Sequence, residues 1–285
     1  MYKALNYWVF GGFEGVRTPF EMIDFGAETG LDGVELTVGD ALKRGITEKE
    51  CREIRQYADS RKIGLRTLAT GFYWTTSLAS ACGKERAEAI EFTKEYLNIA
   101  SWIRVETILV IPGATRVAWD ETRPVMSYRE VWENSVLSLR EVLPLAEKLQ
   151  VNIALENVWN RFLLSPMEWK MYLDQFHHPR LGMYLDAGNC CYIGRAQDYV
   201  EILSGRVKAL HLKNFTETDC CGGLHGFGDD LLSGNVDFRA LFEALGKIDY
   251  QGPVTVEMIP FSRLPDLVLP DEALARDSVR KLLSL

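Results

Sequence analysis

Short apolar runs alternate along the whole chain with longer stretches in which hydrophobic and polar residues are mixed. The apolar runs are rich in Val, Ile and Leu and are bounded by Gly, Pro and polar residues, a pattern typical of buried β-strands. The predicted strands are residues 3–10, 33–36, 64–70, 107–111, 151–155, 181–185, 207–212 and 253–256.

Each strand candidate is followed by a stretch with helical periodicity. Two of these stretches carry clear start signals. Thr47 with Glu50 three residues later forms a capping box, and Ser165 followed by Pro166 supplies an N-cap and a first helical residue. The predicted helices are residues 19–28, 47–61, 84–101, 128–149, one that opens at 166, 196–203, 238–248 and 278–283.

Regular alternation of strand and helix predicts parallel strands joined by right-handed crossovers. A chain of 285 residues is long enough to close such a unit into a barrel. We therefore expect the α/β class, with residues 1–285 forming a single (β/α)8 TIM-barrel domain. A doubly wound open sheet is the alternative, but no G-x-G-x-x-G follows the first strand, which favours the barrel.

Composition and charge narrow the functional classes. The formal net charge of −8 argues against a nucleic-acid partner, because such binding depends on neutralising phosphates with Lys and Arg. No apolar run approaches the roughly 20 residues that cross a bilayer, and the N-terminus lacks a secretory signal, so we expect a cytoplasmic protein without a membrane partner. The six cysteines show no C-x-x-C zinc spacing and favour a reduced compartment over a disulfide framework.

Four consecutive strands end in residues that can bind a metal. Active sites of (β/α)8 barrels lie at the C-terminal ends of the strands. The fifth to eighth predicted strands end at Glu156, Asp186, His211 and Glu257. A lone strand-end carboxylate is often a cap or an ion-pair partner, but three anions on one rim would repel one another without a cation. This oxygen-rich set predicts one divalent ion, with Mn²⁺, Mg²⁺ or Co²⁺ preferred and Zn²⁺ as an alternative.

Five sequence segments carry a resemblance to a known family: GLDGVEL, ALENVWNRF, YLDAGN, HLKNF and VTVEM. They resemble the sugar isomerase and epimerase family with the xylose-isomerase-like barrel, which includes ketose 3-epimerases, pentulose-5-phosphate 3-epimerases and inosose dehydratases. The resemblance covers nearly the whole chain, but its motifs are not specific for one substrate. It implies that Glu156, Asp186, His211 and Glu257 bind one divalent ion and that Glu156 and Glu257 also act as acid and base. It further implies a small sugar or sugar phosphate as substrate and a homodimer or homotetramer.

The chemistry of epimerisation supports these roles. Inverting a carbon next to a ketone requires that a proton be removed from one face and returned to the other. A metal that polarises the carbonyl stabilises the enediolate, and two carboxylates on opposite sides can exchange protons with it. The sequence therefore predicts a metal-dependent sugar or sugar-phosphate isomerase or epimerase of the ketose 3-epimerase type.

Further residues are candidates for contacts with substrate. Asn189 stands where free-ketose 3-epimerases of the resembled family carry a histidine, which favours a phosphorylated or cyclic polyol substrate. Lys213 points to the same side of its strand as His211, where it holds a substrate oxygen or phosphate, or neutralises the carboxylates. Near other strand ends, the candidates that line the pocket are Glu35, Trp8, Asn157 and Arg161. The alternatives are a structural role for Glu35, core packing for Trp8 and a loop salt bridge for Arg161.

Two other enzyme activities and one non-catalytic function stay open. An inosose-type dehydratase would use the same metal site, and it differs only in expelling a β-hydroxyl from the enediolate. A metal-dependent phosphodiesterase of the endonuclease IV kind needs several zinc ions and more histidines than the four in this chain. A non-catalytic sugar-binding barrel is the third alternative. It is disfavoured because such a protein would not need the complete set of four metal-binding residues.

Overall fold

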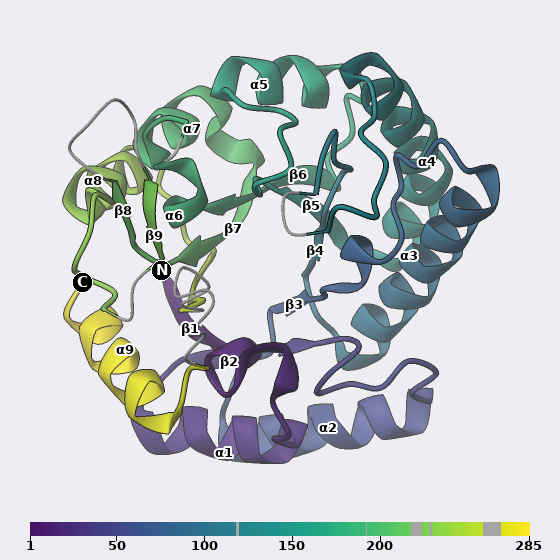
Figure 1. The fold of residues 1–285 in the computed structure, drawn as a ribbon. Coiled ribbons are helices and arrows are strands. Elements are labelled where there is room, and N and C mark those ends of the chain that lie inside the picture. The colour runs from purple at the N-terminus through teal and green to yellow at the C-terminus, as the bar shows by residue number, and fades with distance from the viewer. Residues whose placement is uncertain (118–119, 192, 218–223, 228–229, 259–268) are drawn as a thin grey trace.

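Eight parallel strands close into a barrel, and the helices form a ring outside it (Figure 1). The computed structural model describes residues 1–117, 120–191, 193–217, 224–227, 230–258 and 269–285. Around the barrel the strand order is β1-β10-β7-β6-β5-β4-β3-β2, and all adjacent strands of the barrel are parallel. The closed barrel confirms the predicted fold class and excludes the open sheet.

The barrel strands coincide closely with the apolar runs of the sequence. Strands β2 (Gly33–Thr37) and β6 (Leu181–Asp186) are buried at every residue, as expected when helices cover the outside and side chains fill the inside. The remaining barrel strands are β1 Tyr2–Asn6, β3 Thr67–Ala69, β4 Thr107–Val110, β5 Asn152–Glu156, β7 Val207–Leu212 and β10 Pro253–Val256.

The helices begin where the sequence places polar caps. Thr47 accepts a hydrogen bond from the Glu50 backbone, and the Glu50 carboxylate accepts one from the Thr47 backbone, so the predicted capping box is present. Ser165 and Glu168 repeat this arrangement. The helices are α1 Pro19–Thr29, α2 Glu48–Arg61, α3 Gly83–Ile103, α4 Tyr128–Leu149, α5 Pro166–Asp174, α6 Ala187–Cys190, α7 Ala196–Leu203, α8 Phe238–Lys247 and α9 Glu272–Ser284. None of the helices within the described ranges is long and apolar enough to cross a membrane.

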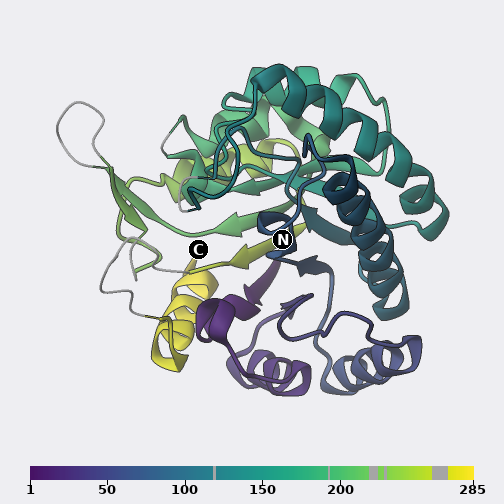
Figure 2. The same ribbon diagram turned by 45° about the vertical axis from the view of Figure 1, so that its right-hand side comes forward.

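Two segments differ from the sequence expectation. The first strand ends at Asn6 and not at residue 10, because the Asn6 side chain accepts a hydrogen bond from the Trp8 backbone and starts the 3-10 helix Tyr7–Val9. Leu224–Phe227, which is not among the predicted strands, forms strand β9, antiparallel to β8 (Phe215–Glu217). The two strands project from the barrel (Figure 2), while residues 220–223 and 228 lie outside the described part of the chain.

Close packing at the start of β2 depends on a glycine, which gives a test of the barrel packing. A Cβ atom on Gly33 would lie 1.6 Å from the Tyr2 hydroxyl and 2.3 Å from the backbone oxygen of Gly64, with which Gly33 forms an isolated bridge. We expect Gly33→Ala to lower the free energy of unfolding by about 1–3 kcal/mol, because the Tyr2 ring and the Gly64 backbone must move to admit the methyl group. Urea unfolding measures this change. The matched control is Gly246→Ala in α8, where nothing lies within 4 Å of the added Cβ and no loss is expected; equal losses in both variants would contradict the packing argument.

Candidate metal centre and active site

The four predicted ligands converge at one end of the barrel. Glu156 ends β5, Asp186 ends β6, His211 lies in β7 and Glu257 directly follows β10. Asp186 and His211 are register partners on adjacent strands. All four side chains are buried, and each offers a donor atom within 4.8 Å of the others. Parallel strands deliver their carboxyl ends to the same rim, so the strand topology produces the cluster.

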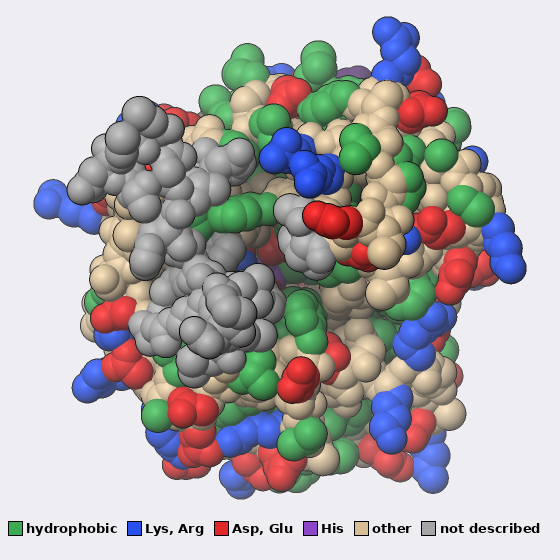
Figure 3. Space-filling view, in the orientation of Figure 1, with side chains coloured by type: hydrophobic (Ala, Val, Ile, Leu, Met, Phe, Trp, Pro, Cys, Tyr) green, Lys and Arg blue, Asp and Glu red, His purple; other side chains and the backbone are tan. Residues whose placement is uncertain are grey.

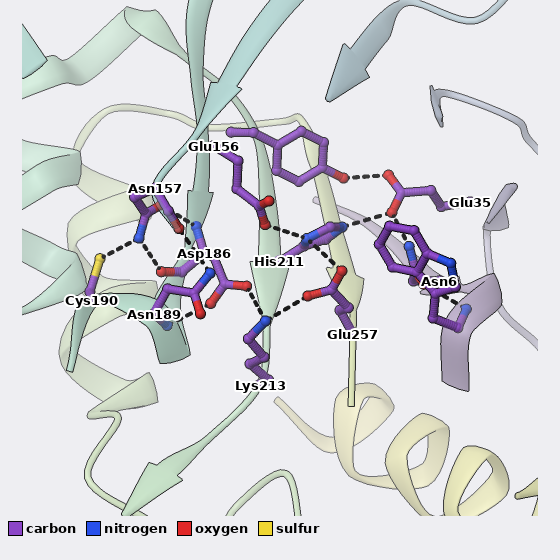
Figure 4. Close-up of polar contacts among 12 residues, drawn as sticks. Asn6, Glu35, Glu156, Asn157, Asp186, Asn189, Cys190, His211, Lys213 and Glu257 are labelled. Carbon is purple, nitrogen blue, oxygen red and sulfur yellow. Dashed lines mark hydrogen bonds and ion pairs between the residues drawn. The ribbon is translucent and has the colours of Figure 1, made fainter. Parts of the chain in front are cut away.

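His211 lies at the centre of the cluster (Figure 4). Its Nδ1 lies 3.1 Å from Glu156 Oε1 and 3.4 Å from Glu257 Oε1. The ammonium of Lys213 borders the other side, 2.7 Å from Glu257 Oε2 and 2.9 Å from Asp186 Oδ2. The space-filling view shows a hollow near the middle of this face, over the barrel strands (Figure 3).

Burial and mutual repulsion dominate the electrostatics of the carboxylates. Chiefly because of burial, the pKa of Glu156 is raised to about 7, with the charge of Glu257 adding to the rise and His211 opposing it. Burial also raises the pKa of Asp186, against the effect of Lys213. The carboxylates can therefore ionise together only beside positive charge.

The pKa values of the basic groups are also raised, but here the neighbouring carboxylates and not burial are the cause. Burial alone would lower the pKa of His211, but the charges of Glu257 and Glu35 raise it well above its usual value. The pKa of Lys213 is likewise raised, because Asp186 and Glu257 outweigh its burial. Considering the protein groups alone, the cluster therefore retains protons and positive charge to balance its anions.

The donor set fits a divalent cation. Ligand atoms bound about 2.0–2.6 Å from one ion lie up to about 4–5 Å from each other, which matches the mutual distances of these donors. Three carboxylates with one imidazole suit the harder divalent ions. A cation among the carboxylates would also supply the positive charge that their burial demands.

Comparison with known proteins agrees with the barrel fold. The sequence model of the xylose isomerase-like TIM barrel family matches residues 23–285. The chain belongs to this family. The match spans all four candidate ligands and every barrel strand except β1.

Two curated relatives of this chain are named as sugar 3-epimerases. A ketose 3-epimerase of Arthrobacter globiformis is 28% identical over 265 residues, which cover 89% of this chain and 81% of the relative. The L-ribulose-5-phosphate 3-epimerase UlaE of Salmonella paratyphi A is 26% identical over 258 residues, which cover 88% and 85% of the two chains.

Among solved structures, D-psicose 3-epimerase from Clostridium cellulolyticum H10 superposes with a TM-score of 0.80. The superposition covers 100% of this chain and 97% of the other at 20% identity. At that identity the likeness concerns the fold alone, and it shows that the barrel fold extends over the whole chain.

Asn157 and Asn189 hold Asp186 in place. The Asn157 amide donates to the Asp186 carbonyl at 2.9 Å and to Cys190 Sγ, and its oxygen accepts the Asp186 N–H at 2.8 Å. The Asn189 backbone N–H donates to Asp186 Oδ1, and the Asn189 amide donates to the Asn157 carbonyl. Since these contacts occupy the Asn157 side chain, they argue for a positioning role in place of the predicted substrate contact.

Lys213 lies inside the carboxylate cluster. It is 6% exposed, and its two ion pairs favour charge neutralisation over the alternative of holding a substrate oxygen or phosphate. Its position depends on Gly188 of the YLDAGN segment, because a Cβ there would lie 2.6 Å from Lys213 Cγ. The glycine therefore lets β7 and α6 approach closely enough for the ammonium to reach Asp186.

Glu35 and Trp8 are both buried. Glu35 is fully buried, and its carboxylate accepts hydrogen bonds from Asn6 and Tyr184 and contacts His211. Its contacts are therefore with protein groups, which favours the structural alternative for Glu35 over a contact with substrate. Trp8 is 5% exposed, donates from Nε1 to Asp40 at 2.8 Å and packs edge-on against Phe13.

Arg161 is exposed on the loop after β5. Its backbone has φ of +54°, a left-handed conformation uncommon outside glycine, and its carbonyl accepts a hydrogen bond from Thr115. Throughout the described ranges its guanidinium has no hydrogen-bonding or ion-pair partner. The side chain is thus available to an anion at the rim.

Sequence reasoning missed Asn6 and Tyr184, which bind Glu35. Asn6 is a polar residue at a strand end, and this signal was hidden because the first strand was predicted to continue to residue 10. Tyr184 lies within the apolar run of β6 and looks like an ordinary core residue. Only their contacts identify them as neighbours of the candidate metal centre.

Proposed function

We propose that this protein is a metal-dependent epimerase of ketoses or ketose phosphates that inverts the carbon next to the carbonyl. The observation that carries the proposal is the buried cluster of Glu156, Asp186, His211 and Glu257 at the C-terminal rim of the barrel. The names of its relatives support the same reaction class, because both curated proteins described above are 3-epimerases.

The proposed metal ligands are the four residues of this cluster. When bound there, a divalent cation supplies Lewis acidity that stabilises negative charge on the oxygens of an enediolate. The buried setting strengthens this effect, since interactions between charges grow as water is excluded. Asn157 and Asn189 keep the Asp186 backbone in place, and Lys213 orients the outer oxygens of Glu257 and Asp186.

Glu156 and Glu257 are proposed to move the protons. They come from β5 and β10, with β6 and β7 between them in the barrel order, so they approach the cluster from different sides. One carboxylate removes the proton next to the carbonyl, and the other returns a proton to the opposite face. Reversing the reaction exchanges the two roles, so both residues are needed in each direction.

Solvent exchange tests this proposal directly. Purified protein with Mn²⁺ is incubated in D₂O with ketopentoses, ketohexoses, their phosphates and inososes, and NMR follows both product formation and deuterium uptake. We expect deuterium at C3 and the appearance of the C3 epimer for at least one ketose or ketose phosphate. Dehydrated product from an inosose would assign the dehydratase instead, and the absence of exchange on every compound would contradict the proposal.

A variant of Arg161 tests whether the substrate carries a phosphate. If the substrate carries a phosphate, Arg161→Ala is expected to raise KM for it by about 10- to 100-fold, the value of one charge-assisted hydrogen bond, with little change in kcat. Steady-state kinetics with matched free and phosphorylated ketoses measure the effect. Arg239→Ala on the outer helix α8 is the control for loss of a surface charge, and equal effects of the two variants would reject a phosphate contact at Arg161.

A further inference from the structure

Glu35 is a buried carboxylate directly behind the proposed metal centre. It lies on β2, across the barrel from His211 on β7, and its exposed fraction is zero. Glu35 Oε1 lies 2.7 Å from His211 Nε2. Glu35 does not belong to the group of four donors, so its contact with the cluster runs through His211 (Figure 4).

The two nitrogens of His211 have different surroundings. Nδ1 faces Glu156 and Glu257, which are candidate metal ligands, whereas Nε2 faces only Glu35. A neutral imidazole carries one proton, and the nitrogen without it has the lone pair that binds a metal. An acceptor at Nε2 holds the proton there and leaves the Nδ1 lone pair directed at the cluster.

Glu35 is itself held firmly. Asn6, its register partner on β1, donates an amide hydrogen bond to Oε1 at 2.7 Å. The hydroxyl of Tyr184 on β6 donates to Oε2. The Tyr184 ring also packs against the His211 ring, with centroids 4.4 Å apart. Side chains from β1 and β6 thus fix the carboxylate of β2 and the imidazole of β7 relative to each other.

We propose that Glu35 is a positioning residue that holds His211 in the Nε2–H tautomer, with Nδ1 directed at the divalent ion. The proposal rests on the metal centre of the proposed function and assigns a role to a residue outside it. Asn6 and Tyr184 support this role by fixing the Glu35 oxygens. The carboxylate also makes the imidazole a stronger donor, because its charge stabilises positive charge on the ring.

Histidine NMR tests the tautomer in the unaltered protein. Protein labelled with ¹⁵N in its histidines is loaded with Mg²⁺, and the His211→Gln variant identifies the His211 resonances among the four histidines. We expect Nε2 to carry the proton and Nδ1 to shift when Mg²⁺ is added. A proton on Nδ1, or a shift confined to Nε2, would overturn the proposal.

Metal affinity tests the contribution of Glu35. Loss of a carboxylate that orients a metal-binding histidine typically weakens metal binding by about 10- to 100-fold, and we expect a loss of this size for Glu35→Gln in calorimetric titration with Mn²⁺. Tyr184→Phe is the matched control, because it removes a hydrogen bond from the same carboxylate and keeps the Glu35–His211 contact; its loss should be smaller.

The outcomes separate this inference from the proposed function. Mn²⁺ affinity in Glu35→Gln within twofold of the original protein would overturn the positioning role, even if turnover fell. Failure of the unaltered protein to bind Mn²⁺ would instead reject the metal centre itself. If Glu35→Gln does not fold, as judged by circular dichroism, the tautomer measurement on the unaltered protein still decides the question.

Discussion

Glu257→Gln is expected to reduce epimerisation by about 10²- to 10⁴-fold, the usual contribution of a general acid or base. The amide keeps the shape of the side chain and one oxygen that can bind a metal, but it cannot exchange a proton. Glu257 lies 3.4 Å from His211 and 2.7 Å from Lys213, so it stands among the ligands where a proton-transfer group is needed. Turnover with the ketose identified by the exchange screen measures the effect.

Comparing Glu257→Gln with Glu156→Gln tests which carboxylate serves which face of the substrate. If each carboxylate serves one face, Glu257→Gln should still exchange the proton of one epimer with D₂O, and Glu156→Gln that of the other. Neither variant should interconvert the epimers. Mn²⁺ titration of both variants serves as the control that the metal site remains. Full turnover in Glu257→Gln with normal metal binding would reject its assignment as acid or base.

Removal of divalent metal is expected to abolish turnover. A cation held by the cluster supplies the stabilisation of the enediolate, and the protein side chains around it offer no other Lewis acid. Dialysis against EDTA should bring the rate to background, and Mn²⁺, Mg²⁺ or Co²⁺ should restore it. Unchanged turnover after chelation, with metal analysis showing no bound ion, would contradict the metal-dependent mechanism.

The same metal should stabilise the folded protein. A ligand present at 100 times its Kd adds about 2.7 kcal/mol to the free energy of unfolding. We expect Mn²⁺ to raise Tm of the chelator-treated protein in a concentration-dependent way and to have no such effect on His211→Gln. His178→Gln is the matched control, since His178 is half-buried beside Glu147, away from the four ligands. A Tm rise of equal size in both variants would place the metal elsewhere.

Local sequence signals predicted the regular elements well. The helices at residues 128–149 and 196–203 and the strands at 207–212 and 253–256 have the predicted bounds in the structure. Their hydrophobic periodicity matches their tertiary environment, so the pattern alone identifies them. The β8–β9 strand pair was missed because its strands are only three and four residues long, too short for a clear alternation of polar and apolar residues.

The sequence by itself determined the barrel class and the four residues that meet at its rim. The C-terminal ends of parallel barrel strands lie at one rim. Residues at those ends of successive strands must therefore lie near one another, and these residues are Glu156, Asp186, His211 and Glu257. Only the tertiary structure decided what the other polar residues do. Glu35 meets His211 across the barrel interior, and such contacts depend on the closure and register of strands far apart in the chain, which no local pattern encodes.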